Sequence, residues 1–168
     1  MKSINEVKQF IIELLKLFPN KETDLVHIGK AYYYANRYAL EDYGTLVSTH
    51  HCVKLDYGPG IDDYREIFDD LVEEGVIYRK ERYLIGLEDI ESHEDFVKFP
   101  EVVLKSIKKA YSEVKEKDFD QLKEETHRLK SYQKALKYSV IDYSEDIFTE
   151  DEINEAKSFL KNIPEFKK

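Results

Sequence analysis

Residues 30–44 read KAYYYANRYALEDYG, residues 45–60 read TLVSTHHCVKLDYGPG, and residues 61–64 read IDDY. We predict a helix that ends at Tyr43, because Gly44 readily takes the left-handed conformation that closes a helix. A short extended run follows it. The segment 57–60 (Tyr-Gly-Pro-Gly) then predicts a tight turn, because proline fixes φ and glycine permits positive φ. An acidic helix comes next, so the order of these elements carries the information about the fold.

Helical patterns continue on the N-terminal side of this stretch. We expect Ser3 to cap a first helix that ends at Pro19, and Thr23 to cap the helix that leads into Tyr43. Gly29 lies inside that second helix, where it costs about 1 kcal/mol relative to alanine. A glycine in this position predicts close packing against a neighbouring element.

The C-terminal side combines a hairpin with further helices. Residues 76–87 predict two strands around a short turn. Pro100 begins an amphipathic helix. Residues 118–137 predict either a second one or a helix with a looser end at 131–132, and Thr149 caps a last helix with Glu152 in the capping-box position. These patterns predict a mainly α fold with a small β component (α+β), a compact helical domain with a short β-hairpin. Because a helix followed by a hairpin ends a winged-helix module, that topology is one of those left open.

The chain length and composition suit one domain with a hydrophobic core. The 168 residues are 42% hydrophobic, and no Gly/Ser-rich linker divides them. We therefore expect one domain over residues 1–168, with a core at 28–88 and C-terminal helices at 100–162. The lone cysteine, the absence of a signal-peptide pattern and the absence of a membrane-length apolar run lead us to expect a cytoplasmic protein without membrane contact.

The negative charge is concentrated in the middle of the chain. Residues 61–98 hold 5 Lys+Arg against 13 Asp+Glu, whereas the whole chain has a net charge of -9. An acidic segment repels phosphates and suits a basic protein partner, so we expect nucleic acid binding to be disfavoured. A solvated helix face gives the same pattern.

The chemistry-bearing residues do not form a catalytic or metal-binding pattern. His50, His51 and Cys52 are consecutive, and neighbouring side chains of a strand point to opposite faces. Cys52 reads as a buried structural cysteine, and the turn at 57–60 lacks the Lys-Ser/Thr of a phosphate-binding loop. We therefore expect no enzyme activity, no metal and no cofactor.

Tyrosine is abundant, with 13 residues and no tryptophan. Tyr32, Tyr33 and Tyr34 are consecutive, so their side chains spread around the helix. We expect at least one of them to reach solvent or a partner, since exposed tyrosines favour recognition surfaces. A place at the rim of the core, with the hydroxyl bonded to water, is the alternative.

The order of motifs resembles the Panacea domain, a family of small antitoxins related to phage-associated GepA-like proteins. The matching positions are Lys30, Tyr33, Ala35, Asn36, Arg37, Leu40, Tyr43, Gly44, Val47, Ser48, Val53, Tyr57, Gly58, Pro59 and Tyr64, with Thr126, His127 and Ala135 further on. The sequence departs from the family pattern at Asn36, where aspartate is usual, and at Ala39, Leu46, Thr49 and 60–61.

This resemblance implies a non-enzymatic antitoxin that neutralises a cognate protein toxin by direct binding. The toxin would typically be encoded by the neighbouring gene, and a homodimer is left open. We expect Tyr33, Arg37, Tyr57 and Tyr64 to lie near the partner-binding surface.

Two other functions are weighed beside the antitoxin. A winged-helix-like, DNA-binding transcriptional regulator would use Arg79, Lys80 and Arg82 at the hairpin tip to contact phosphates. A phage-associated protein without catalytic activity is the third.

Overall fold

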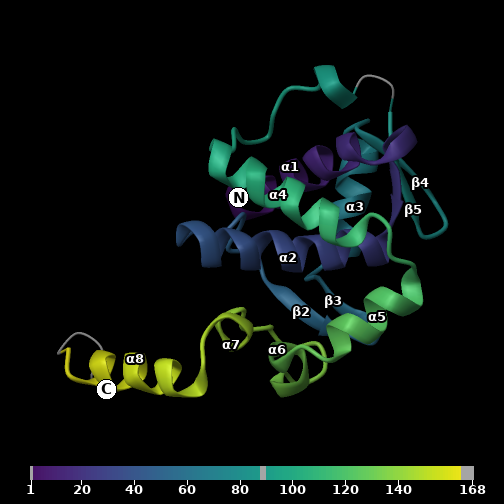
Figure 1. Cartoon of the computed structure of the whole chain (residues 1–168). Helices are drawn as coiled ribbons and strands as arrows, with labels where there is room; N and C mark the ends of the chain where they lie inside the picture. The colour runs from purple at the N-terminus through teal and green to yellow at the C-terminus, as the bar shows by residue number, and fades with distance from the viewer. Residues whose placement is uncertain (1, 88–89, 164–168) are drawn as a thin grey trace.

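The computed structural model describes residues 2–87 and 90–163, and it shows a mainly helical protein with two small antiparallel sheets. Figure 1 shows helix α2 (Leu25–Tyr43) running through the middle of the molecule, with other elements on several sides of it. The fold class expected from the sequence is confirmed. Among the described residues, no helix is long and apolar enough to cross a membrane.

The N-terminal elements differ from the expected pattern at their starts. Helix α1 (Lys2–Leu17) already includes Ser3, so Ser3 is not its cap. A 3-10 turn (Pro19–Lys21) and a three-residue strand, β1 (Glu22–Asp24), follow it. The side chain of Asp24, not Thr23, caps α2, because its Oδ1 accepts from the His27 N–H at 2.9 Å and Thr23 is held in the strand.

The three consecutive tyrosines of α2 are all buried, so the expectation that one of them reaches solvent is wrong. Tyr32 and Tyr33 are 0% exposed and Tyr34 is 3% exposed. The reason is that α2 is covered on several sides, most extensively by helix α4 (Glu101–Val114), and also by strand β3 (Gly58–Ile61) and helix α5 (Phe119–His127). Residues 28–36 are buried on every side of the helix, whereas aromatic exposure begins only toward its C-terminal end, where Tyr43 is 45% exposed.

A two-stranded hairpin lies against α2. It consists of β2 (Cys52–Leu55) and β3 (Gly58–Ile61), so residues 58–60 belong to a strand rather than to the turn. The role expected for Gly29 is confirmed: a Cβ built there would lie 2.7 Å from the Pro59 carbonyl oxygen. The other edge of β2 pairs with residues 138–141, with Val53 opposite Val140.

A second sheet joins the N-terminal strand to a later hairpin. Helix α3 (Tyr64–Glu73) leads into β4 (Ile77–Lys80) and β5 (Tyr83–Gly86), and the strand order is β1-β5-β4. The chain order α1, β1, α2, α3, β4, β5 with this strand order is the topology of a winged-helix module. The β2–β3 hairpin is inserted between its second and third helices.

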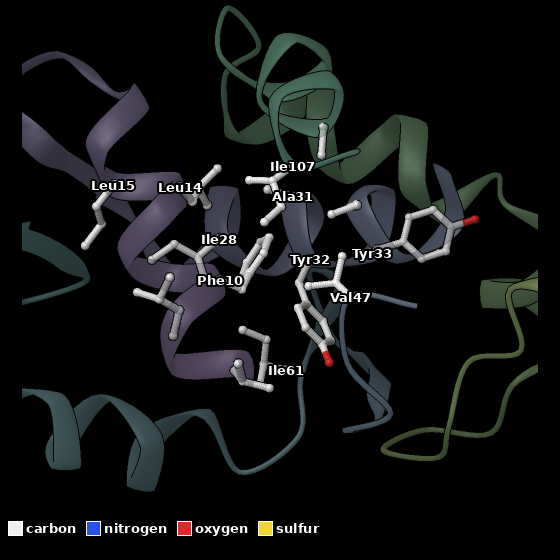
Figure 2. Packing of buried hydrophobic residues seen from close by; sticks show 14 of the residues in the cluster. Phe10, Leu14, Leu15, Ile28, Ala31, Tyr32, Tyr33, Val47, Ile61 and Ile107 are labelled. Atoms are coloured by element: carbon white, nitrogen blue, oxygen red, sulfur yellow. The ribbon is translucent and has the colours of Figure 1, made fainter. Parts of the chain in front are cut away.

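The core lies between α1, α2 and α4. Figure 2 shows Phe10, Leu14, Ile28 and Tyr32 converging there, and the Phe10 and Tyr32 rings meet edge to face at 5.3 Å between centroids. Burial of such apolar side chains stabilises the fold by about 1.5–3 kcal/mol each. This packing fixes α2 as the rigid element on which the loops are mounted.

The C-terminal part is a series of short helices. Between α4 and α5 a capping box on Asp118 closes the start of α5 (Phe119–His127), and α6 (Lys130–Lys134) is separate, so residues 118–137 are not one helix. Helix α7 (Ser144–Ile147) follows, and α8 (Glu150–Lys161) begins with the expected capping box of Thr149 and Glu152. Before α4, a short 3-10 turn (Ile90–Ser92) lies in the connector, and residues 88–89 fall outside the described part of the chain.

Candidate functional site

A groove with a volume of about 560 Å³ lies beside the β2–β3 hairpin and the start of α3. We call it the acidic–aromatic groove. Its members come from the hairpin, from the loop before α3, from the first turn of α3 and from the segment after α6: Val53, Leu55, Asp56, Tyr57, Ile61, Asp62, Asp63, Tyr64, Arg65, Glu66 and Tyr138. Three tyrosines and four carboxylates therefore share one concave surface with a single arginine.

Tyr57 and Tyr64, two of the residues expected near a partner, line this groove and are both half-buried. Tyr64 packs on Phe68, and the Tyr57 ring lies 6.4 Å from that of Phe119. Partial burial, and then the neighbouring Tyr64 hydroxyl, raise the pKa of Tyr57, so its phenol is neutral at physiological pH. Both rings present apolar area and a hydrogen-bonding group to the groove.

A fully buried lysine fixes the hairpin end that carries Tyr57. The Lys30 Nζ donates to the Tyr57 carbonyl at 2.5 Å and lies 3.4 Å from the Pro59 carbonyl. Gly58 has a φ of 117°, which strains any other residue, and a Cβ there would also lie 2.5 Å from the Lys30 Nζ, so glycine is strongly favoured at this position. Burial lowers the pKa of Lys30 from 10.5 to about 7. The Lys-Tyr-Gly-Pro part of the motif is therefore one structural unit, with Tyr57 at its outer side.

Tyr33 and Arg37, the other two residues expected at the surface, do not line the groove. The Tyr33 hydroxyl donates to Asp146 Oδ2, and the Arg37 side chain lies 3.4 Å from the Asp146 carbonyl. The same carboxylate accepts from the Ser131 backbone N–H at 3.0 Å and from its hydroxyl. Tyr33 is fully buried, so in this structure it joins α2 to α6 and α7 and contacts no solvent.

Asn36 anchors the loop that leads to the hairpin. Its Oδ1 accepts from the backbone N–H groups of Val47 and Ser48 at 3.0 and 3.2 Å, and its Nδ2 donates to the Tyr32 carbonyl at 3.0 Å. All four residues are buried. A polar side chain is needed here because buried N–H groups without a partner are costly. Much of the 30–48 motif thus positions loops on α2.

The basic residues at the β4–β5 turn form a separate small patch. Arg79 lies 3.9 Å from Asp69 and stacks over Phe68, whereas Lys80 and Arg82 are exposed. The neighbouring helix α3 carries acidic residues, Glu66, Asp69, Asp70 and Glu73. The structure therefore places a negative helix where a winged-helix protein presents its recognition helix to DNA.

The remaining chemistry-bearing residues serve the architecture. Cys52 is buried, and burial raises the pKa of its thiol to about 12, which makes a thiolate nucleophile unfavourable. The Nε2 atom of His50 lies 2.7 Å from the Asp62 carbonyl, linking the start of the hairpin to its end. Within residues 2–87 and 90–163, no group of three or more His, Cys, Asp or Glu side chains could hold a metal ion.

Sequence reasoning missed several members of the groove. Tyr138 is 62% exposed and comes from a segment more than 70 residues after Tyr64. Only long-range pairing of residues 138–141 with β2 brings it to the groove. Asp62 and Glu66 were signalled only by the general acidity of residues 61–98.

Comparison with known protein families identifies the family of the chain. The family model described as antitoxin SocA-like, Panacea domain, matches residues 28–133, which is more than half of the chain. The match begins in α2 and includes the whole β2–β3 hairpin, α3 and α5. No curated protein and no solved structure matches the chain. The chain belongs to the SocA-like Panacea antitoxin family.

Proposed function

We propose that this member of the SocA-like Panacea family is a non-enzymatic antitoxin that binds a protein toxin in the cytoplasm through its acidic–aromatic groove. Family membership is the observation that supports an antitoxin function. We choose the groove as the binding surface because it brings tyrosines and carboxylates together in one hollow.

The aromatic residues make this groove suited to a protein partner. Tyr138 exposes 62% of its surface, and Tyr57 and Tyr64 are half-buried in the walls of the groove. Tyrosines are enriched among residues that dominate binding energy, since each offers a large area for little loss of side-chain entropy. The two half-buried rings are already ordered by Phe68 and Phe119, which reduces the entropy lost on binding.

The charges of the groove predict the chemistry of the toxin surface. Asp56, Asp62, Asp63 and Glu66 surround the tyrosines, and Arg65 is the one cation among the groove members. Asp56 forms an ion pair with Lys137 at 3.1 Å, but both side chains are about 60% exposed, so this ion pair is weak and leaves Asp56 able to bind a partner. A basic segment of the toxin would complement this surface, and its association would slow as salt is added.

Tyr33 and Arg37 act in this proposal as positioning residues rather than as contacts. They hold Asp146, which in turn orders α6 and the segment that delivers Tyr138. Replacing them would therefore change the groove indirectly, together with the stability of the protein.

A DNA-binding regulator is the second candidate, favoured by the winged-helix strand order β1-β5-β4. Its phosphate contacts would be Arg79, Lys80 and Arg82. The carboxylates of α3 oppose it, because each would face the phosphate backbone. A gel-shift titration with the DNA upstream of the gene, at low and high salt, distinguishes the two functions.

Co-expression with the product of the neighbouring gene tests the antitoxin proposal. We expect that product alone to arrest growth, and this chain to restore it and to co-purify with it. Tyr138→Asn should weaken the rescue, because it removes the exposed ring from the groove. Asparagine is the replacement because it tolerates the positive φ of 65° at this position.

The matched control is Tyr78→Thr, because Tyr78 is also exposed (47%) but lies on β4, outside the groove. Equal rescue by both variants would move the binding surface away from the groove. A neighbouring product that is not toxic, or a wild-type chain that fails to rescue growth, would refute the antitoxin function.

A further inference from the structure

Helix α8 presents an apolar face that the described part of the chain does not cover. It projects from the body on the side away from the β4–β5 hairpin (Figure 1). Its face is formed by Ile153, Ala156, Phe159 and Leu160, and with Phe148 these side chains line a hollow of about 700 Å³. Phe159 is 68% exposed and Leu160 is 42% exposed. Side chains of this size are normally covered when they gather on one surface.

The first turn of α8 is capped and is linked to α6, so the direction of its apolar face is set by the sequence at its start. The capping box of Thr149 and Glu152 satisfies its first N–H groups. Glu150 accepts from Lys134 at 3.2 Å and lies 3.4 Å from Lys130, which ties the first turn to α6. The apolar face therefore has a defined direction relative to the body.

The charges along α8 indicate what covers it. The first half carries Glu150, Asp151, Glu152 and Glu155, and the second half carries Lys157 and Lys161. A second α8 laid antiparallel on the first places each acidic half beside the partner's basic half. A parallel arrangement would place like charges together, and the helix dipoles also favour the antiparallel one.

We propose that α8 mediates homodimerisation by packing on α8 of a second copy of this chain, in an antiparallel and two-fold symmetric arrangement. If the two helices cross near Ala156, Leu160 of one copy lies beside Ile153 of the other. Both copies then use the same surface, as a two-fold symmetric dimer requires. The helix is about 18 Å long at ~1.5 Å per residue. One such helix per copy gives less than the ~800 Å² per partner of a standard interface, so the dimer should be concentration-dependent. This inference does not rest on the proposed antitoxin function.

Sedimentation equilibrium of the full chain tests the proposal. We expect the wild type to pass from monomer to dimer as its concentration rises. Leu160→Ser should raise the dissociation constant at least about tenfold, which is the factor that 1.4 kcal/mol produces. Circular dichroism of each variant verifies that α8 remains helical.

A charge exchange tests the antiparallel arrangement separately from the apolar contact. Glu155→Lys and Lys157→Glu, which both border the apolar hollow, should each weaken the homodimer, because each brings like charges together across the interface. An equimolar mixture of the two should form a heterodimer, whereas each alone stays weakened.

A wild-type chain that remains monomeric at all accessible concentrations would overturn the proposal. A dimer that Leu160→Ser leaves unchanged would also overturn it, because the contact would then lie on another face. Failure of the mixture to restore association would refute the antiparallel geometry. Loss of toxin rescue by Leu160→Ser without any change in association would assign the face to the toxin instead.

Discussion

Asn36 should be among the polar side chains on which the fold most depends, and Asn36→Ala tests this. The substitution removes the acceptor for the buried N–H groups of Val47 and Ser48, at 3.0 and 3.2 Å. Each unsatisfied buried donor costs about 1–3 kcal/mol, so we expect a loss of about 2–6 kcal/mol. Domains of this kind have a free energy of unfolding of about 5–15 kcal/mol, which makes the loss a large fraction of the total.

Urea denaturation followed by far-UV circular dichroism measures this loss. With a slope of about 1–3 kcal/mol/M, the midpoint should fall by on the order of 1 M or more. Asn36→Asp is the matched control, because aspartate keeps an oxygen for both N–H groups, although it buries a carboxyl group and sets its second oxygen against the Tyr32 carbonyl. Because the two N–H groups stay satisfied, it should cost less than alanine. A midpoint for Asn36→Ala equal to that of the wild type would refute the role of Asn36 in holding the 47–48 loop.

Three further predictions concern α2 and its contacts. Gly29→Ala should destabilise the protein by about 1–2 kcal/mol in the same assay, although alanine has the higher helix propensity. The new Cβ would lie 2.7 Å from the Pro59 carbonyl oxygen, and a backbone atom cannot rotate away as a side chain can. Unchanged stability would contradict the close approach of the hairpin to α2. For Lys30 the folded pKa is lowered to about 7, so the unfolded state binds more protons up to pH 10.5. The wild type should therefore gain stability relative to Lys30→Met as pH rises from about 7, by on the order of 1 kcal/mol per pH unit, and a flat difference would count against burial of the ammonium. Burial lowers the pKa of His27, but its contacts with Asp24 at 2.9 Å outweigh this and raise it, so its stabilisation is full below pH 6.5 and is lost as pH rises through the higher folded pKa; His27→Gln should remove that part of the pH dependence of the melting temperature.

The local signals in the sequence were sufficient for several elements. Gly44 closes α2 with φ 68°, Gly29 allows the hairpin to approach, and Thr149 caps α8 as its spacing with Glu152 predicts. Each of these depends on residues within a few positions of one another, or on a property of glycine itself. The α+β class followed from the same periodicities.

The wrong predictions concern features that depend on contacts between segments far apart in the sequence. Strand β1 is only three residues long and exists because β5, some 60 residues later, pairs with it. The break between α5 and α6 is supported by the Asp146 carboxylate, which accepts from the Ser131 N–H at the start of α6. The tyrosines of α2 are buried because elements far along the chain enclose the helix. No local pattern reports such contacts.

The candidate site was only partly predictable for the same reason. Tyr57 and Tyr64 lie in the motif and in the groove, whereas Tyr33 and Arg37 lie in the motif and away from the groove. The motif contains both kinds because most of its residues hold the hairpin and loops on α2. Tyr138 lies outside the motif and reaches the groove through the pairing of residues 138–141 with β2.

The most direct test of the central claim is the dissociation constant between this chain and the product of the neighbouring gene, with the groove charges reversed. Asp62→Lys/Glu66→Lys changes two groove carboxylates, and Glu73→Lys/Glu116→Lys makes the same change in net charge at exposed positions outside the groove. Loss of two charge contacts should weaken binding by about 1–3 kcal/mol each, or at least about tenfold overall, and reduce its salt dependence. The control variant should bind as the wild type does. Equal weakening by both pairs, or by neither, would contradict binding through the acidic–aromatic groove.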